Sequence, residues 1–284
     1  NTIPNEGHIH AVTLHYHIQY VSNIINKKPQ QAARDLDRLI ELLEKRPERI
    51  RDEPNAYMTA LGNKIGMLLQ TRQLEEVPKL IRKIRNVPAD FNIKNRQKIS
   101  LKLLLRTYNI ELELYRDTGQ YDRGVALIGE AKELIHKEKK HISEEYVLQF
   151  YYQFAYIYFM QKDYDRALDW LNKMVNESFE GSRQDLQIYA RLLILMIHLE
   201  LDNIMVLKYS IAAYRRFLKK RRQLETFEKI LLKFFSKICM AFSYEYPALF
   251  QQLYADLFDG EEEILTRNHL DYLDFRTWIE GHLE

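Results

Sequence analysis

Residues 149–171 read QFYYQFAYIYFMQKDYDRALDWL, and this stretch decides the expected fold. Seven aromatic residues fall within its first eleven positions, and a short charged turn separates them from a second apolar run. The apolar residues of both halves recur at the three- and four-residue intervals of an amphipathic helix. Because the connection is short, the stretch predicts two antiparallel helices joined as a hairpin.

The composition of the whole chain favours helices as well. Its 284 residues are 46% hydrophobic and 29% charged, with 9 Gly and 7 Pro, which is too few for the turns of an all-β protein. Start and stop signals divide the sequence into about twelve helices. The expected segments are about 7–26, 29–46, 54–70, 74–86, 89–117, 121–137, two helices capped by Ser143 and Ser182, 203–220, 223–243, 247–258 and 262–282.

The second helices of successive hairpins repeat one pattern. The segments QLEEVPKLIRKI, QYDRGVALIGEA and DYDRALDWLNKM place Val77, Gly124 and Ala167 at equivalent positions, spaced by 47 and then 43 residues. Self-similarity at such a period is typical of helical-repeat architectures. The sequence therefore predicts an irregular repeat.

At these residues the chain resembles the tetratricopeptide repeat family. The segment in the 150s matches eight signature positions of that family, which are Tyr151, Phe154, Ala155, Tyr158, Tyr164, Ala167, Leu171 and Met174. The repeat at 108–131 departs from the pattern, with Glu111 where leucine is usual and Gly124 where alanine is. The resemblance covers roughly residues 50–220, and the chain as a whole is similar to uncharacterised bacterial helical-repeat proteins.

The resemblance implies an all-α fold, a right-handed solenoid of about five to six antiparallel helix hairpins. The repeat array is expected over residues 1–222, and a C-terminal helical cap over 223–284. In this family the first helix of each hairpin lines a concave groove that holds peptides. The residues implied for that groove are Arg106, Asn109, Glu113, Arg116, Gln149, Tyr152, Tyr156, Phe159, Arg191 and His198, with Gln153 at its edge.

These residue types suit an extended peptide. Tyrosine rings supply contact area, while amide and guanidinium groups bind backbone or carboxylates. Two readings of the aromatic stretch stay open. Tyr152, Tyr156 and Phe159 either face a ligand or pack onto the following hairpin, whereas Tyr151 and Phe154 belong to the packing within the repeat.

Motifs for catalysis or metal binding are not found in the sequence. The histidines His8, His10, His15 and His17 are two, five or seven residues apart. Only the pairs seven apart share a helical face, and their Cα atoms are about 10 Å apart, which is too far for a shared metal ion. The glycines form no phosphate-binding loop, and neither G-x-S-x-G nor H-E-x-x-H occurs. Glu261, Glu262 and Glu263 are interpreted as helix-capping residues. We therefore expect neither an enzyme nor a cofactor or metal.

The charge distribution bears on the kind of partner. The formal net charge is +2, which gives no overall field to attract nucleic acid. Residues 215–222 form a basic run. We interpret it as the last turn of a helix, where basic side chains are favourable, in preference to a phosphate-binding site. Single-stranded nucleic-acid binding, through Tyr152, Tyr156 and Arg106, remains an alternative, as does a peptide-sensing regulatory module. The leading hypothesis is a noncatalytic protein–protein interaction scaffold that binds a peptide or protein segment.

Location is predicted from three features. The longest strongly apolar run, Leu192–Ile197, is far short of the ~20 residues that span a bilayer, so no membrane span is expected. The first residues, NTIPNEGH, lack the basic flank and apolar run of a secretory signal. A single cysteine, Cys239, suits core packing in a reducing compartment. Together these features indicate the cytoplasm.

Overall fold

The computed structural model describes residues 9–94, 96–176, 183–221, 224–259, 264 and 272–283. Within these residues the chain forms fourteen α-helices, a few short 3-10 helices and no strand, which confirms the all-α class. None of the helices described is both long and apolar enough to cross a membrane. The chain divides into two compact units, unit 1 (Asn1–Gln120) and unit 2 (Tyr121–Glu284). Both sides of the expected 222/223 boundary therefore lie in unit 2.

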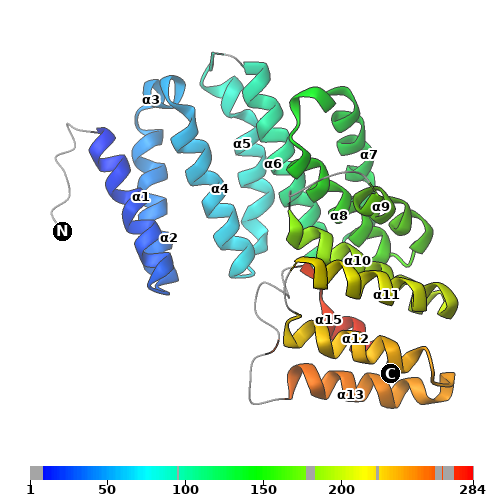
Figure 1. The fold of residues 1–284 in the computed structure, drawn as a ribbon. Helices are drawn as coiled ribbons and strands as arrows, with labels where there is room; N and C mark the ends of the chain where they lie inside the picture. Colours follow the sequence, from blue (N-terminus) through cyan, green and yellow to red (C-terminus); the bar gives the residue numbers. More distant parts are fainter. Residues whose placement is uncertain are drawn as a thin grey trace. The chain divides into compact units, whose positions relative to one another are not determined.

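Unit 1 is a succession of helices in which each packs against its neighbours in the chain (Figure 1). In chain order these are α1 (Ile9–Ile25), α2 (Pro29–Glu44), α3 (Pro47–Asp52), α4 (Pro54–Gln70), η1 (Leu74–Glu76), α5 (Val77–Asp90) and α6 (Arg96–Asp117).

Prolines set the starts of three helices in unit 1. Pro29, Pro47 and Pro54 each occupy the first turn, where a missing N–H costs no hydrogen bond. The expected break at Pro88 is wrong, because α5 continues through it to Asp90. Pro88 lies in the last turn, so few intrahelical bonds depend on it, and its burial offsets the loss.

The core of unit 1 follows the helical period of the sequence. On α2 the buried residues recur at intervals of three and four, and they pack against the buried residues of α4. Fully burying one such leucine stabilises the fold by roughly 1.5–3 kcal/mol, so the stripe fixes which face of α2 points inward. The buried residues of α2 are Ala32, Leu36, Leu39, Ile40 and Leu43.

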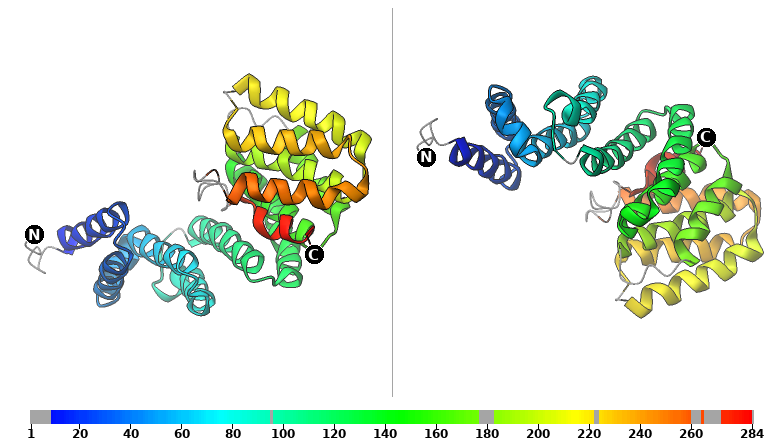
Figure 2. Two further views of the ribbon diagram at one scale, coloured as in Figure 1. Left: turned by 90° about the horizontal axis from the view of Figure 1, so that it is seen from below. Right: turned by 90° about the horizontal axis from the view of Figure 1, so that it is seen from above.

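Unit 2 holds the second succession of helices. Figure 2 shows α11, α12 and α13 side by side, with α15 packed against α13. The elements are α7 (Tyr121–Lys137), η2 (Lys139–His141), α8 (Glu144–Met160), α9 (Tyr164–Asn176), α10 (Gln184–Glu200), α11 (Ile204–Arg221), α12 (Thr226–Ile238), η3 (Ser243–Glu245), α13 (Tyr246–Phe258) and α15 (Phe275–Glu280).

Helix ends in unit 2 differ in part from the expectations. Ser143 takes the N-cap position of α8, but its side chain makes no capping hydrogen bond. At α12 the N-cap is Glu225, whose backbone N–H donates to the Glu228 carboxylate at 3.0 Å. Cys239 is buried just after that helix, as expected of a packing residue.

The basic run forms the end of α11, where Leu218 is buried. Several sequence expectations fall on residues outside those described, namely His8, the side chains of His10 and Arg221, Ser182, Arg222, and Glu261, Glu262 and Glu263 with most of the expected helix 262–282.

Candidate functional site

The aromatic residues of α8 divide between two faces of the helix. Tyr151 contacts Trp170 of α9, with ring centroids 5.0 Å apart. Tyr152, Tyr156 and Phe159 form a second row, with successive centroids 6.4 and 6.3 Å apart. Because each residue turns an α-helix by about 100°, Tyr151 lies roughly 80–140° around α8 from these three residues and so faces a different side of the helix. We call the second row the tyrosine face.

The tyrosine face is covered by residues 272–283, the C-terminal segment. The Tyr152 hydroxyl donates to the backbone carbonyl of Tyr272 at 3.0 Å, and the backbone N–H of Asp274 donates to the Tyr156 hydroxyl at 3.1 Å. Asp274 lies outside any helix, so its N–H has no helical partner. The two tyrosines thus hold the backbone from Tyr272 to Asp274 through its own polar groups.

Tyr272 is the first anchor of the C-terminal segment. Its ring stacks on Tyr189 of α10, with centroids 4.3 Å apart, and its hydroxyl donates to the Asp185 carboxylate. Arg183 pairs with the same carboxylate at 2.7 Å. Burial acts to raise the pKa of Asp185, but hydrogen bonds from Arg183 and Tyr272 outweigh it and lower that pKa. Burial and the Asp185 bond both raise the pKa of Tyr272.

Glu200, at the end of α10, forms the second anchor. Its Oε1 accepts a hydrogen bond from Trp278 Nε1 at 2.7 Å and lies 2.8 Å from His282 Nε2. The Tyr164 hydroxyl donates to Oε2 at 3.3 Å. Burial acts to raise the pKa of Glu200, but the bonds from His282 and Trp278 prevail and lower it. Burial, followed by the Glu200 charge and hydrogen bond, raises the pKa of Tyr164 to about 12.

Helix α15 adds apolar packing to these anchors. Phe275 and Ile279 are fully buried, and the Phe275 ring lies edge-on to Phe227 of α12 at 5.1 Å. Trp278 lies edge-on to Phe250 of α13 at 5.3 Å. The C-terminal segment is therefore part of the core of unit 2. A cavity of about 180 Å³ remains between this segment and α8, α9 and α10.

The expected exposure of the tyrosine face is not found. Tyr152, Tyr156 and Phe159 are 2%, 4% and 7% exposed, because the C-terminal segment covers them. Packing onto the following hairpin was the alternative expected for these rings, and the C-terminal segment, more than a hundred residues later in the chain, takes part in covering them.

The other groove residues expected in unit 2 have varied surroundings. Gln149 is half-buried, and Gln153 is buried with an Oε1 that has no hydrogen-bond partner among the described residues. Arg191 donates to the backbone carbonyl of Gln187 at 3.0 Å and lies over the Phe217 ring at 3.8 Å. It is thus held within the helix pair α10 and α11.

His198 is the last of these residues, in the final turn of α10. Burial lowers its pKa, which favours the neutral ring near pH 7. Its Nδ1 has no hydrogen-bond partner among the described residues.

Four expected groove residues belong to unit 1. Arg106, Asn109, Glu113 and Arg116 follow one side of α6 at intervals of three and four residues. Asn109 is 7% exposed, and neither amide atom finds a hydrogen-bond partner in the described part of the chain. The Arg116 Nε donates to the neighbouring Asp117 at 2.9 Å.

Several contact residues were missed in the sequence. Asp185 and Tyr189 lie one turn apart on α10, and neither was among the expected groove residues. The C-terminal segment carried a signal of its own. Tyr272, Phe275, Trp278 and Ile279 are apolar at helical spacing, which indicates a segment that packs on a larger apolar face.

The described residues contain no group of three or more His, Cys, Asp or Glu side chains close enough to hold a metal ion. Comparisons with protein-family models, with curated proteins and with solved structures each found no significant match to this chain.

Proposed function

We propose that the chain is a noncatalytic interaction scaffold in which a helical-repeat array of the tetratricopeptide type, a right-handed solenoid, binds a peptide segment of a partner protein. One observation carries this proposal. The tyrosine face already holds a peptide segment, its own C-terminal residues, by hydrogen bonds to backbone groups at Tyr272 and Asp274. Bonds to backbone depend little on sequence, whereas the sites of Tyr272 and Trp278 select aromatic side chains.

The partner's segment is expected to resemble the internal one. It carries an aromatic residue that stacks on Tyr189 and a second one, six residues later, that donates to Glu200. The internal segment competes with it at an effective concentration in the millimolar range, as for any tethered ligand. Binding in trans therefore requires that the C-terminal segment be displaced.

Displacement can be measured with a fluorescein-labelled peptide of residues 272–284, YLDFRTWIEGHLE. The full chain with Phe275→Ala and Trp278→Ala should bind this peptide at least about tenfold more tightly than the unsubstituted chain, because its own segment competes less. Fluorescence anisotropy gives both affinities. Glu280→Ala is the matched control, since Glu280 is exposed on the same helix and pairs with the exposed Arg276 at 3.7 Å.

A cleavable version of the chain provides an independent test in case the double variant does not fold. A protease site placed within residues 265–271 leaves the C-terminal segment bound but no longer tethered after cleavage. Excess labelled peptide should then exchange into unit 2, and a scrambled peptide should not. A cleaved chain that stays folded and takes up no peptide would mean that the C-terminal segment is a fixed cap, and the proposal would be wrong.

A further inference from the structure

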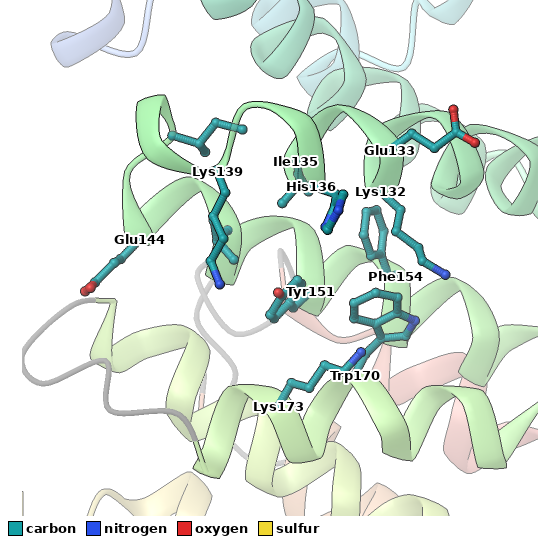
Figure 3. A pocket seen from close by; sticks show the side chains of 12 residues that line it. Lys132, Glu133, Ile135, His136, Lys139, Glu144, Tyr151, Phe154, Trp170 and Lys173 are labelled. Atoms are coloured by element: carbon teal, nitrogen blue, oxygen red, sulfur yellow. The ribbon is translucent and has the colours of Figure 1, made fainter.

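A cavity of about 840 Å³ lies on a different side of α8 from the tyrosine face, between α7, η2, α8 and α9 (Figure 3). Its lining belongs wholly to unit 2. The hydrogen bonds to the C-terminal segment described above are made by Tyr152, Tyr156, Asp185 and Glu200, which are not part of this lining. A ligand in this cavity is thus separate from the peptide of the proposed function. The volume is within the ~300–1,000 Å³ typical of small-molecule sites.

Aromatic rings form the floor of this cavity. Tyr151 and Phe154 both contact Trp170, with ring centroids 5.0 and 5.1 Å apart. Phe154 is fully buried and supports the floor from within, while Trp170 is 9% exposed and Tyr151 is half-buried, so these two rings form the accessible surface. Ile135 and Ile142 extend the apolar wall. A flat apolar ligand would find preformed ring surfaces here, at little cost in side-chain ordering.

Cations border the opening. Figure 3 shows the ammonium ends of Lys132, Lys139 and Lys173 directed toward the space around the aromatic floor, while the carboxylates of Glu133 and Glu144 point away from it. Lys173 Nζ lies 4.1 Å from the centroid of Trp170. In the part of the chain that the structure describes, none of the three lysines makes an ion pair.

The aromatic floor and the lysines at the opening together favour a ligand that has both an aromatic ring and a negative charge. Three ammonium groups around one opening repel each other, and an anion placed among them relieves that repulsion. The aromatic floor favours a ring over inorganic phosphate alone, because the ring also removes apolar surface from water. We propose that this cavity binds a small aromatic anion, with its ring on Trp170 and Tyr151 and its carboxylate or phosphate facing Lys132, Lys139 and Lys173.

The indole N–H signals of the two tryptophans give a direct readout on the full chain. Trp170 is in the cavity, whereas Trp278 donates its indole N–H to Glu200 on the other side of α8, so it serves as an internal control. The two signals are assigned with Trp170→Phe. Phenyl phosphate and adenosine monophosphate are the probes. Each should shift the Trp170 signal in a saturable way and leave the Trp278 signal in place.

Simpler compounds separate the two parts of the recognition. Phenol carries the ring without the charge, and inorganic phosphate carries the charge without the ring. Each should bind at least about tenfold more weakly than phenyl phosphate, because each keeps only one of the two interactions. Added salt should weaken the binding of phenyl phosphate, because it screens the charge interaction, and should leave the binding of phenol unchanged.

Lysine variants provide the matched comparison. Lys139→Gln and Lys173→Gln should each lower the affinity for phenyl phosphate about threefold, and the double variant should lower it about tenfold. Effects of this size are expected of partly exposed charges. Lys137→Gln is the control. Lys137 is exposed on α7 outside the lining, and its substitution changes the net charge by the same amount. An unmoved Trp170 signal at millimolar probe, equal binding of phenol, or undiminished binding by the double variant would each overturn the proposal.

Discussion

The Tyr152 hydroxyl donates a hydrogen bond to the backbone carbonyl of Tyr272, 3.0 Å away and 120 residues later in the chain. This bond joins α8, the second α-helix of unit 2, to the last described segment of that unit. Helical arrays are otherwise held together by contacts between neighbours in sequence, so their ends stay open unless another segment covers them. In unit 2 the C-terminal segment covers the tyrosine face of α8, and its polar anchors make its attachment testable.

The first prediction concerns the Asp274 amide, whose only acceptor among the bonds described above is the Tyr156 hydroxyl. Tyr156→Phe removes that acceptor and keeps the ring. Amide hydrogen exchange at Asp274 should become about fivefold faster, as expected for a hydrogen bond worth about 1 kcal/mol. Tyr146→Phe, at a 36%-exposed position of the same helix, should leave it unchanged. Equal exchange in both variants would show that this bond does not hold the segment.

The second prediction is a pH dependence at Glu200. The pKa of Glu200 in the folded chain is below its ordinary value of 4.5, because bonds from His282 and Trp278 favour the ionised carboxylate over the opposing effect of burial. A carboxyl with a lowered pKa stabilises the fold above the unfolded value and loses that contribution as pH falls through the folded pKa. Attachment of the C-terminal segment should therefore be complete above about pH 4.5 and weaken at lower pH.

The Trp278 indole N–H resonance follows this change directly, since that group donates to Glu200. In Glu200→Gln the resonance should depend less on pH in the acidic range, because the amide does not titrate. The glutamine keeps an oxygen that can accept the Trp278 hydrogen bond but carries no charge. The variant therefore tests the charge of Glu200 separately from its hydrogen bond to Trp278. An identical pH profile for both proteins would assign the dependence to another group, with Asp185 the next to test, since its pKa is also lowered.

Much of the helical arrangement could be predicted from local sequence. Helix α7 runs from Tyr121 to Lys137 as expected, because its apolar period and its flanking turns lie within the segment itself. The two faces of α8 were also separable, since helical geometry alone places Tyr151 and Tyr152 about 100° apart. Such features depend only on residues a few positions away.

The cover of the tyrosine face could not be predicted in this way. Periodicity shows that Tyr152 and Tyr156 share a face, but it does not show which distant segment packs on that face. The contact with Tyr272 depends on the path of all the helices between them. The predicted helix break at Pro88 was wrong for a related reason. Local rules count the missing N–H of proline, but they do not count the burial that offsets it.

A third prediction concerns Cys239. The side chain is 9% exposed, and burial raises the pKa of its thiol, with the Lys208 charge acting in the opposite sense. Since the thiolate is the reactive form, the folded protein should react with a disulfide reagent at pH 7 at least about tenfold more slowly than the urea-unfolded chain. Colorimetric release of the reagent's thiol measures both rates. Equal rates would mean that the thiol is accessible in the folded state.

The last prediction compares two glycines of α7. A Cβ at Gly129 meets no atom within 4 Å, so Gly129→Ala should stabilise unit 2 by about 0.5–1 kcal/mol through helix propensity. A Cβ at Gly124 would lie 2.9 Å from Ile157 Cδ1 of α8, and Ile157 is fully buried. Overpacking costs about 1–3 kcal/mol, which exceeds the propensity gain, so Gly124→Ala should destabilise. Denaturant unfolding followed by tryptophan fluorescence reports unit 2, which contains both tryptophans. Adding Ile157→Val removes Cδ1 and should recover part of the Gly124→Ala loss; no recovery would place the strain elsewhere.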